Sequence, residues 1–293
     1  MTRVANALSL GGVTTPALSR RNVLLGLVAT ATAVAFARCG TEATGQAAQV
    51  DSAPPAPLPP EWPTLLPPPP QTARVSLPGG AVLNTLPGPG DLMALTLDDG
   101  VDTSVVRAYA QLAHDTGIRL TMFVNGVYAS WTDNRDLLAP LVESGQLQLG
   151  NHTWRHLDLT RLTAPHIADE LRHNGQFLKD TFGVDAAPYF RPPYGAYDDV
   201  VTKVAGDLGY TVITLWNGNL GDDATLAPRD IVANATKYCT AQNIVIGHLN
   251  HPPVTAVYHQ LVDVIAERNL RTVTLNDVFT KPEVTRLTSA YPT

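Results

Sequence analysis

From residue 90 onward, short apolar runs alternate with longer amphipathic segments, and this alternation restricts the possible folds of the 293-residue chain. The runs have the length and the composition of buried strands, and the segments between them are long enough for helices. Strands that alternate with helices form parallel sheets covered by crossover helices. The sequence therefore predicts an α/β fold with about seven parallel strands, too few for an eight-stranded barrel. The expected strands are residues 92–97, 118–124, 146–151, 188–191, 211–216, 243–248 and 271–275, and the expected helices include 103–116, 164–182, 198–209 and 254–268.

Two adjacent carboxylates close the first apolar run, in the sequence Thr96-Leu97-Asp98-Asp99-Gly100. Neighbouring side chains on a straight strand point to opposite faces, so both carboxylates can reach one site only where the strand ends and the chain bends. Asp and Gly are also common in solvated turns, which is the alternative interpretation. Because α/β proteins carry their chemistry at the carboxyl ends of strands, Asp98 and Asp99 are candidates for a functional site.

A His-x-x-x-His sequence follows the third apolar run, at His152 and His156. A spacing of four would place the two imidazoles on one face of a helical turn, where both can reach one ion. Together with Asp99 they form a set of two histidines and one carboxylate, which leaves positions on a metal ion for water and substrate. An open set of this kind suits hydrolysis, whereas a structural site would need a fourth protein ligand.

Two further polar clusters also follow expected strands. One is Arg191-Pro192-Pro193-Tyr194-Gly195, after an aromatic pair, and the other is Gly247-His248, after an Ile-Val-Ile run. Taken singly, the prolines could stiffen a loop and the histidine could be structural. Four polar clusters at the ends of four separate strands predict one common site.

These four clusters resemble ordered motifs of the polysaccharide deacetylase family, the NodB-homology carbohydrate esterases of carbohydrate esterase family 4. Residues 96–100 are similar to its Thr-Phe-Asp-Asp-Gly, with Leu for Phe, and residues 152–156 resemble its metal-binding histidine pair. Residues 191–194 match its Arg-Pro-Pro-Tyr, and residues 246–248 its Leu-x-His, with Ile for Leu. The resemblance covers roughly residues 90–280 and implies a distorted (β/α) barrel of the NodB type.

The remaining family motif departs from the pattern. The family has Asp-x-x-Asp followed by an aromatic residue, whereas this chain has Asn219, Asp222 and Asp223 at those three positions. Asp222 could still supply the carboxylate that the family places beside its catalytic histidine. The missing aromatic wall of the substrate groove could come from one of three other residues: Trp154, Trp216 or Tyr197.

The resemblance implies one divalent metal ion, held by Asp99, His152 and His156. Zinc is the first expectation, and cobalt or another divalent ion would suit the same ligands. Such an ion lowers the pKa of a bound water molecule and polarises the acetyl carbonyl group.

The resemblance also implies roles for the other motif residues. Asp98 would be the general base, with Arg191 paired to it. His248 would protonate the leaving amine, and Asp222 would keep that imidazole charged. Three groups would contact the substrate acetyl group or line its site: the backbone N–H of Tyr194, Ile246 and Trp216.

The expected activity is hydrolysis of N-acetyl groups on an amino-sugar polymer such as peptidoglycan or a chitin-type oligosaccharide, with O-acetyl removal as a close variant. A metal-dependent amidase for a small amide is one alternative, but it would not need an exported, Pro-rich architecture. A non-catalytic glycan-binding relative is the other. That relative would be expected to lose Asp98, Asp99 or His248, and all three are present.

The amino-terminal region has the composition of an export signal followed by a spacer. Residues 1–37 resemble a twin-arginine-type signal, with an apolar stretch too short for a stable membrane span. Residues 38–75 are Pro-rich and predict an extended linker or stalk. We then expect the catalytic domain at 76–285 and a C-terminal tail at 286–293. This organisation predicts a secreted or envelope-associated protein.

The charge and the cysteines narrow the choice of partners. A net charge of −6 argues against nucleic acid or an anionic membrane, and it is compatible with a neutral acetylated glycan. Lipid anchoring at Cys39 is a weaker alternative to cleavage, because Arg38 fits a lipobox poorly. Cys39 and Cys239 could pair in an oxidising compartment. We expect a monomer with no membrane span in the mature chain.

Overall fold

The computed structural model describes residues 61–77, 80 and 82–280. The predicted export signal, Cys39, the linker up to residue 60 and the C-terminal tail lie outside these described residues. The chain divides after Pro57, and every described residue belongs to the second unit, Leu58–Thr293. Within the described part of the chain, no helix combines the length and the apolar character needed to cross a lipid bilayer.

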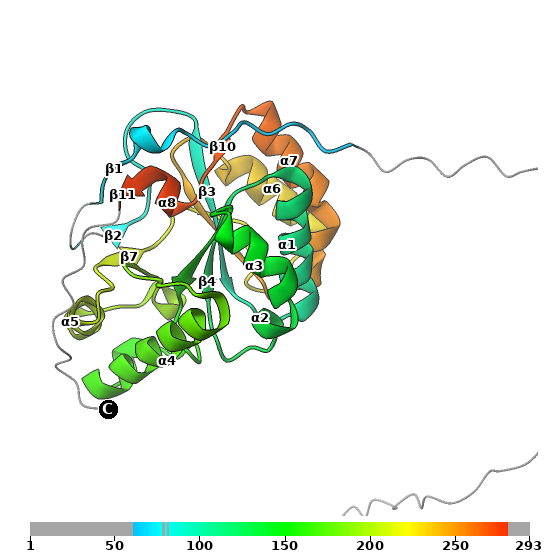
Figure 1. Ribbon diagram of the computed structural model, residues 1–293. Coiled ribbons are helices and arrows are strands. Elements are labelled where there is room, and N and C mark those ends of the chain that lie inside the picture. The colour runs from blue at the N-terminus through cyan, green and yellow to red at the C-terminus, as the bar shows by residue number, and fades with distance from the viewer. Residues whose placement is uncertain (1–60, 78–79, 81, 281–293) are drawn as a thin grey trace, which may run out of the picture. The chain divides into compact units, whose positions relative to one another are not determined.

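A curled parallel sheet lies at the centre of the domain (Figure 1). Its strands are β2 (Val82–Leu83), β3 (Leu92–Asp99), β4 (Leu120–Val124), β5 (Leu147–Asn151), β6 (Tyr189–Phe190), β7 (Val212–Thr214), β8 (Gly218–Asn219), β9 (Ile244–His248) and β10 (Arg271–Thr272). They follow the order β2-β7-β6-β5-β4-β3-β9-β8, with β10 paired to the first residues of β3. All pairings within this sheet are parallel.

The sheet confirms the predicted fold class, because each of the seven expected strands is present. Two further strands, β2 and β8, contain two residues each and lie at the two ends of the strand order. Among the described residues these end strands do not pair with each other, so the barrel is open on one side. The result is a distorted (β/α) barrel.

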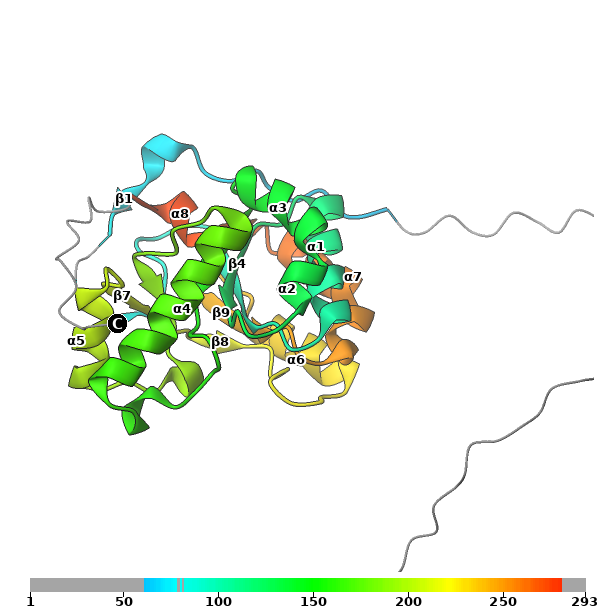
Figure 2. The ribbon, with the colours of Figure 1, turned by 60° about the horizontal axis from the view of Figure 1, so that its bottom comes forward.

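Helices cover the outside of the curled sheet. The α-helices are α1 (Thr103–Thr116), α2 (Ser130–Asp133), α3 (Arg135–Glu143), α4 (Ala164–Phe182), α5 (Asp199–Asp207), α6 (Pro228–Tyr238), α7 (Tyr258–Glu267) and α8 (Leu275–Val278). Short 3-10 turns are η1 (Gln71–Ala73), η2 (Leu159–Arg161), η3 (Pro193–Gly195) and η4 (Pro252–Val257). In both views α6 and α7 lie together beside α1, and α4 lies beside α5 on the other side of the sheet (Figure 1, Figure 2).

The ends of α1 show how local sequence sets an element. Asp102 precedes the helix, and its carboxylate accepts hydrogen bonds from the backbone N–H groups of Ser104 and Val105. Gly117 follows the helix with a left-handed φ of 75°, the conformation that glycine adopts most readily at a helix end. The helix therefore occupies the expected segment, 103–116.

Strand β3 separates two environments by its period of two. Met93, Leu95 and Leu97 belong to the larger apolar cluster, which packs beneath the helices. Ala94 belongs to a second cluster with Phe123 and Tyr189 of neighbouring strands. Thr96 and Asp98 lie on the same face of β3 as Ala94. Their buried polar side chains therefore lie on the inner face of the barrel, near the carboxyl edge of the sheet.

Part of the predicted linker lies against the domain. The ring of Trp62 stacks on that of His259 in α7, with ring centroids 3.8 Å apart and planes 6° apart. The carbonyl oxygen of Pro67 accepts a hydrogen bond of 2.5 Å from Arg271 Nη1. After η1, β1 (Val75–Ser76) pairs in parallel with β11 (Phe279–Thr280) in a separate two-stranded sheet. The domain start at residue 76 stays a prediction.

Candidate active site

The carboxyl ends of four strands bring the predicted residues together. Asp98 and Asp99 end β3, His152 follows β5, Arg191 follows β6 and His248 ends β9. Strands β3 and β9 are direct neighbours, and Asp98 is the register partner of His248. Since parallel strands present their carboxyl ends at one edge, residues separated by up to 150 positions meet in one cluster.

Asp99, His152 and His156 converge on one point. Asp99 Oδ1 lies 3.3 Å from Nε2 of His152 and 3.3 Å from Nε2 of His156. This oxygen is buried and makes no hydrogen bond with any described residue. Ligand atoms bound tetrahedrally at about 2.0–2.1 Å from a zinc ion would be about 3.3 Å apart, so the spacing of these atoms fits a metal site.

The side chains that surround these three atoms fix their orientation. The other ring nitrogen of His152, Nδ1, lies 2.7 Å from the carbonyl oxygen of Arg191, and a proton on Nδ1 directs the Nε2 lone pair toward Asp99. The second oxygen of Asp99, Oδ2, accepts a hydrogen bond of 2.6 Å from Asn250 Nδ2. One oxygen of Asp99 is thus held by the protein, and the other remains for an ion.

The histidine pair does not lie on a helical turn, and that part of the prediction was wrong. Thr153 and His156 both have left-handed backbone conformations, with φ of 71° and 58°. Asn151 Oδ1 accepts a hydrogen bond from Thr153 N, and Thr153 Oγ1 accepts one from His156 N. These bonds shape a tight loop that returns His156 to the site, so the imidazoles converge without helical spacing.

Left-handed backbone conformations are concentrated in this site. Besides the two in the histidine loop, Asp99 has a φ of 76° and Tyr194 a φ of 60°. Such conformations cost of the order of 1–3 kcal/mol in residues other than glycine and persist where surrounding contacts enforce them. At Asp99 the bend turns its side chain away from the strand alternation, which lets both carboxylates reach one site, as predicted.

Asp98 forms a buried ion pair with Arg191. Arg191 is fully buried, and its Nη1 donates a hydrogen bond of 2.6 Å to Asp98 Oδ1. The guanidinium also donates to the carbonyl oxygens of Thr214 and Leu215 and to Thr96 Oγ1. Burial lowers the pKa of Arg191, although Asp98 opposes this effect. The second oxygen, Asp98 Oδ2, lies 3.6 Å from His152 Nε2, on the side of the metal cluster.

His248 contacts the carboxylate that the altered motif supplies. His248 Nδ1 lies 3.1 Å from Asp222 Oδ1. Burial disfavours the imidazolium ion, but Asp222 and the charges of Asp98 and Asp99 outweigh this effect and raise the pKa of His248 to about 8. Asn219, in contrast, accepts a hydrogen bond of 2.6 Å from Gly221 N and shapes the turn before Asp222.

The residues predicted to contact substrate have different exposures. Tyr194 is 69 % exposed, and its ring lies edge-on to His156 with centroids 4.7 Å apart. Ile246 is buried in β9, and the Trp216 ring lies 5.5 Å from the guanidinium carbon of Arg191. Trp154 packs against the rings of His173 and Phe177, which both belong to α4. Trp154, Trp216 and Tyr197 were the three candidates to replace the missing aromatic wall of the groove. Of these, Tyr197 is the exposed one.

Three residues that support the site were not predicted from the sequence. Trp131 Nε1 donates to the carbonyl oxygen of Asp99, and Asn250 holds the Asp99 carboxylate. Thr96 accepts from Arg191 and donates to the carbonyl oxygen of Val245. The available signal was that Thr96 begins the motif at residues 96–100 and that Asn250 lies two residues after His248. Trp131 lies outside every motif, and only the fold brings it beside Gly100.

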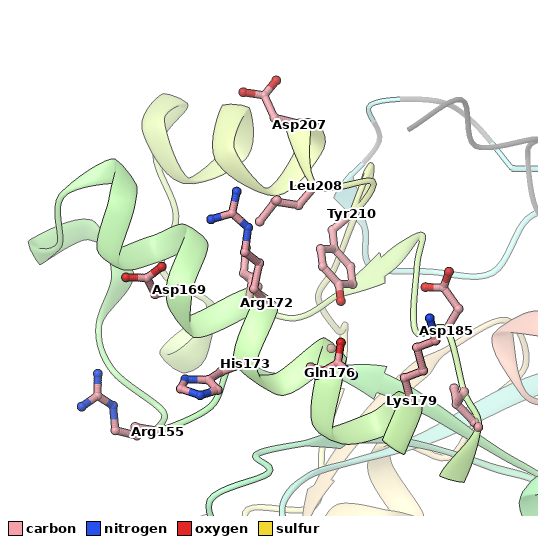
Figure 3. A pocket seen from close by; sticks show the side chains of 14 residues that line it. Arg155, Asp169, Arg172, His173, Gln176, Lys179, Asp185, Asp207, Leu208 and Tyr210 are labelled. Atoms are coloured by element: carbon pink, nitrogen blue, oxygen red, sulfur yellow. The ribbon is translucent and has the colours of Figure 1, made fainter. Parts of the chain in front are cut away.

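A separate hollow of about 930 Å³ lies between α4 and the end of α5 (Figure 3). Figure 3 shows acidic and basic side chains of α4 around it, including Asp169, Arg172 and Lys179, together with Asp207 of α5. None of the predicted catalytic or metal-binding residues lines this hollow. The hollow therefore does not define the candidate active site, which is the strand-end cluster.

Comparison with known proteins agrees with the geometry. The family model described as polysaccharide deacetylase matches residues 86–213. A chitin deacetylase of Arthroderma benhamiae is 30 % identical over 214 residues, which are 71 % of this chain and 57 % of that protein. A peptidoglycan-N-acetylglucosamine deacetylase of Bacillus cereus is 27 % identical over 172 residues, covering 58 % of this chain and 78 % of that protein. The chain belongs to the polysaccharide deacetylase family.

Solved structures support the same fold for this polysaccharide deacetylase family member. A carbohydrate esterase family 4 pseudoenzyme from Bacillus anthracis superimposes with a TM-score of 0.61 at 16 % identity, covering 70 % of this chain and 71 % of that one. At this identity the likeness shows the fold alone. The chain also spans little more than half the length of the Arthroderma chitin deacetylase.

Proposed function

We propose that this polysaccharide deacetylase family member is a secreted or envelope-associated, metal-dependent hydrolase that removes N-acetyl groups from an amino-sugar polymer. Peptidoglycan and chitin-type oligosaccharides are the substrate classes that its relatives suggest. The observation that carries the proposal is the buried Asp99 oxygen at 3.3 Å from two imidazole nitrogens, beside the Asp98–Arg191 pair and the His248–Asp222 pair. Family membership supports it.

The metal site would be made by Asp99, His152 and His156. A divalent ion bound there would activate a water molecule and polarise the acetyl carbonyl. Zinc suits a set of two imidazoles and one carboxylate, and cobalt or another divalent ion suits it as well. Asn250 and the carbonyl group of Arg191 would keep the ligands oriented.

Asp98 would accept the proton of the attacking water. Its Oδ1 is held by Arg191, so Oδ2 is the oxygen left for this transfer. The buried guanidinium fixes the carboxylate rotamer and offsets its negative charge. Arg191 in turn is held by bonds to three other groups, so the pair acts as one rigid unit.

His248 would give a proton to the leaving amine. A pKa of about 8 keeps most of this imidazole protonated at pH 7, as a general acid requires. Asp222 supports the charged form from the side opposite to the reacting group. The backbone N–H of Tyr194 would meet charge on the tetrahedral oxygen, and Ile246 would line the pocket for the acetyl methyl group.

The completeness of these residues favours an enzyme over a non-catalytic relative. The related Bacillus anthracis protein is described as a pseudoenzyme, so loss of activity occurs on this fold. Here the residues assigned to base, acid and metal binding are all present. Asp98 and the three metal-binding residues are joined by contacts of 3.6 Å or less, and His248 contacts Asp222. The twin-arginine-like sequence and the Pro-rich segment support export of the protein.

The test is to incubate the zinc-loaded protein with three acetylated substrates: chitin oligosaccharides, peptidoglycan and acetylated xylan. We expect one of the amino-sugar substrates to release acetate together with an equal amount of new primary amine. Acetate released without amine would instead indicate O-deacetylation. If metal-loaded protein releases acetate from none of the three, the proposed function is wrong.

A further inference from the structure

Three buried oxygen atoms behind His248 make no hydrogen bond with any described residue. They are Asp222 Oδ2 and the hydroxyl oxygens of Tyr109 and Tyr258. Asp222 and Tyr109 are at most 1 % exposed, and Tyr258 is 8 % exposed. A buried polar atom without a partner costs about 1–3 kcal/mol, so three in one region require an explanation.

The three side chains come from different elements but lie near one another. Tyr109 belongs to α1 and Tyr258 begins α7, and their ring centroids are 4.8 Å apart. Burial raises the pKa of each phenol, and the negative charge of Asp222 raises the pKa of both further. Asp222 Oδ1 already contacts His248 Nδ1, so Oδ2 is the carboxylate oxygen left without a partner.

Resting on the proposed function, we propose that a buried water molecule joins Asp222 Oδ2 to the hydroxyl groups of Tyr109 and Tyr258, and that this network positions Asp222 behind His248. The three groups make no direct hydrogen bond to one another, so a mediator is needed to satisfy them. A carboxylate only accepts hydrogen bonds, and phenols can donate. A water molecule accepts from both phenols with its two lone pairs and donates to Oδ2, which gives it the usual three partners.

The network acts on His248 through the charge of Asp222. A hydrogen bond donated to Oδ2 stabilises the carboxylate and weakens its pull on the imidazolium proton. Loss of a phenol hydroxyl should therefore raise the pKa of His248. The other groups that act on this imidazole are Asp98, Asp99 and His156, and none of them changes when the phenols are altered.

The test compares Tyr109→Phe and Tyr258→Phe with Tyr189→Phe as the matched control. Tyr189 is also fully buried, but its hydroxyl lies 3.4 Å from the carbonyl oxygen of Leu275 and is not part of the cluster. We expect the first two variants to raise the His248 pKa by about 0.5 unit, measured by NMR on zinc-loaded, histidine-labelled protein. Tyr189→Phe should leave it unchanged.

A crystal structure of the zinc-loaded protein that resolves ordered water provides the second measurement. We expect a water molecule within hydrogen-bond distance of Asp222 Oδ2 and both phenol oxygens. The network is wrong if this position holds no water, or if the His248 pKa in Tyr109→Phe and Tyr258→Phe stays the same or falls. Neither readout requires turnover, so a protein that releases no acetate can still pass both, and that result would overturn the function alone.

Discussion

Asp98 and Asp99 are neighbours in sequence, but the fold gives their side chains different partners. Asp98 continues the inner face of β3 and meets the guanidinium of Arg191. Asp99 bends away in a left-handed conformation and meets Asn250 and two imidazoles. In the proposed function these two chemically identical side chains would have different tasks, proton transfer for Asp98 and metal binding for Asp99.

The first prediction separates these two tasks with Asp98→Asn and Asp99→Asn. Asparagine at 98 can still accept the bond from Arg191, so this donor keeps a partner although the guanidinium loses its counter-ion. We expect this variant to keep its metal and lose about 10²–10⁴-fold in rate. Loss of a residue that only orients a metal ligand typically lowers metal affinity by roughly 10–100-fold. Asp99→Asn changes a ligand itself, so it should lower metal affinity at least as much. The measurements are metal content by mass spectrometry and acetate release. If only the Asp98 variant is purified without metal, the two assignments are reversed.

The second prediction concerns the pH dependence set by Asp222. His248 must be protonated to act as an acid, so the rate should fall as pH rises through its pKa, which Asp222 holds up. Asp222→Asn removes that charge, lowers the pKa of His248 and shifts the alkaline limb of the kcat profile to lower pH. A bound divalent ion lowers this limb in both proteins, so the direction of the difference is preserved.

Asp223→Asn is the matched control for this shift. Asp223 is exposed, and the contact it makes with His251 uses its backbone oxygen. Its substitution should leave the alkaline limb in place. Equal shifts in the two variants would mean that Asp222 has no special connection to His248, and that the altered motif has been aligned incorrectly.

At the scale of elements, the turn after β3 depends on a glycine. Gly100 has a φ of 107°, and a Cβ atom there would lie 2.4–2.7 Å from the indole of Trp131. That indole donates a hydrogen bond to the carbonyl oxygen of Asp99. We expect Gly100→Ala to lower the free energy of unfolding by about 3 kcal/mol and to weaken metal binding, because the clash displaces the Asp99 backbone.

Gly117→Ala tests whether space or backbone conformation decides this effect. Gly117 has a similar positive φ of 75°, but a Cβ atom there would meet nothing within 4 Å. Its substitution should cost about 1 kcal/mol in urea unfolding and leave metal affinity unchanged. If both alanine variants lose the same stability, the contact with Trp131 is not what fixes the turn.

The elements also show how far sequence reasoning reaches. The seven strands and the long helices α1 and α4 were predictable because their apolar periodicity extends over several residues. Strands β2 and β8 were not, since neither lies in an extended apolar run and their pairing is decided by β7 and β9. The histidine loop was predicted with the wrong geometry because side-chain bonds within it, rather than helical spacing, bring the imidazoles together.

At the scale of the whole molecule, the segment before the barrel contributes contacts of its own. We expect Trp62→Ala to lower the free energy of unfolding by about 1–2 kcal/mol, because the indole loses its stacked partner on α7. Acetate release should be unchanged, since the stack lies outside the strand-end cluster. A double-mutant cycle with His259→Ala should give a coupling of about 0.5–1.5 kcal/mol. Additive losses would show that the segment does not depend on this stack.

In the proposed function, the whole domain holds three ligand atoms and two proton-transfer groups at one edge of the sheet. The measurement that tests this account most directly is acetate release during titration of metal-free protein with zinc, with bound metal measured at each step. We predict that activity is absent without metal and rises in proportion to zinc until one ion is bound per chain. Full activity in rigorously metal-free protein, or no activity with one equivalent bound, would contradict it.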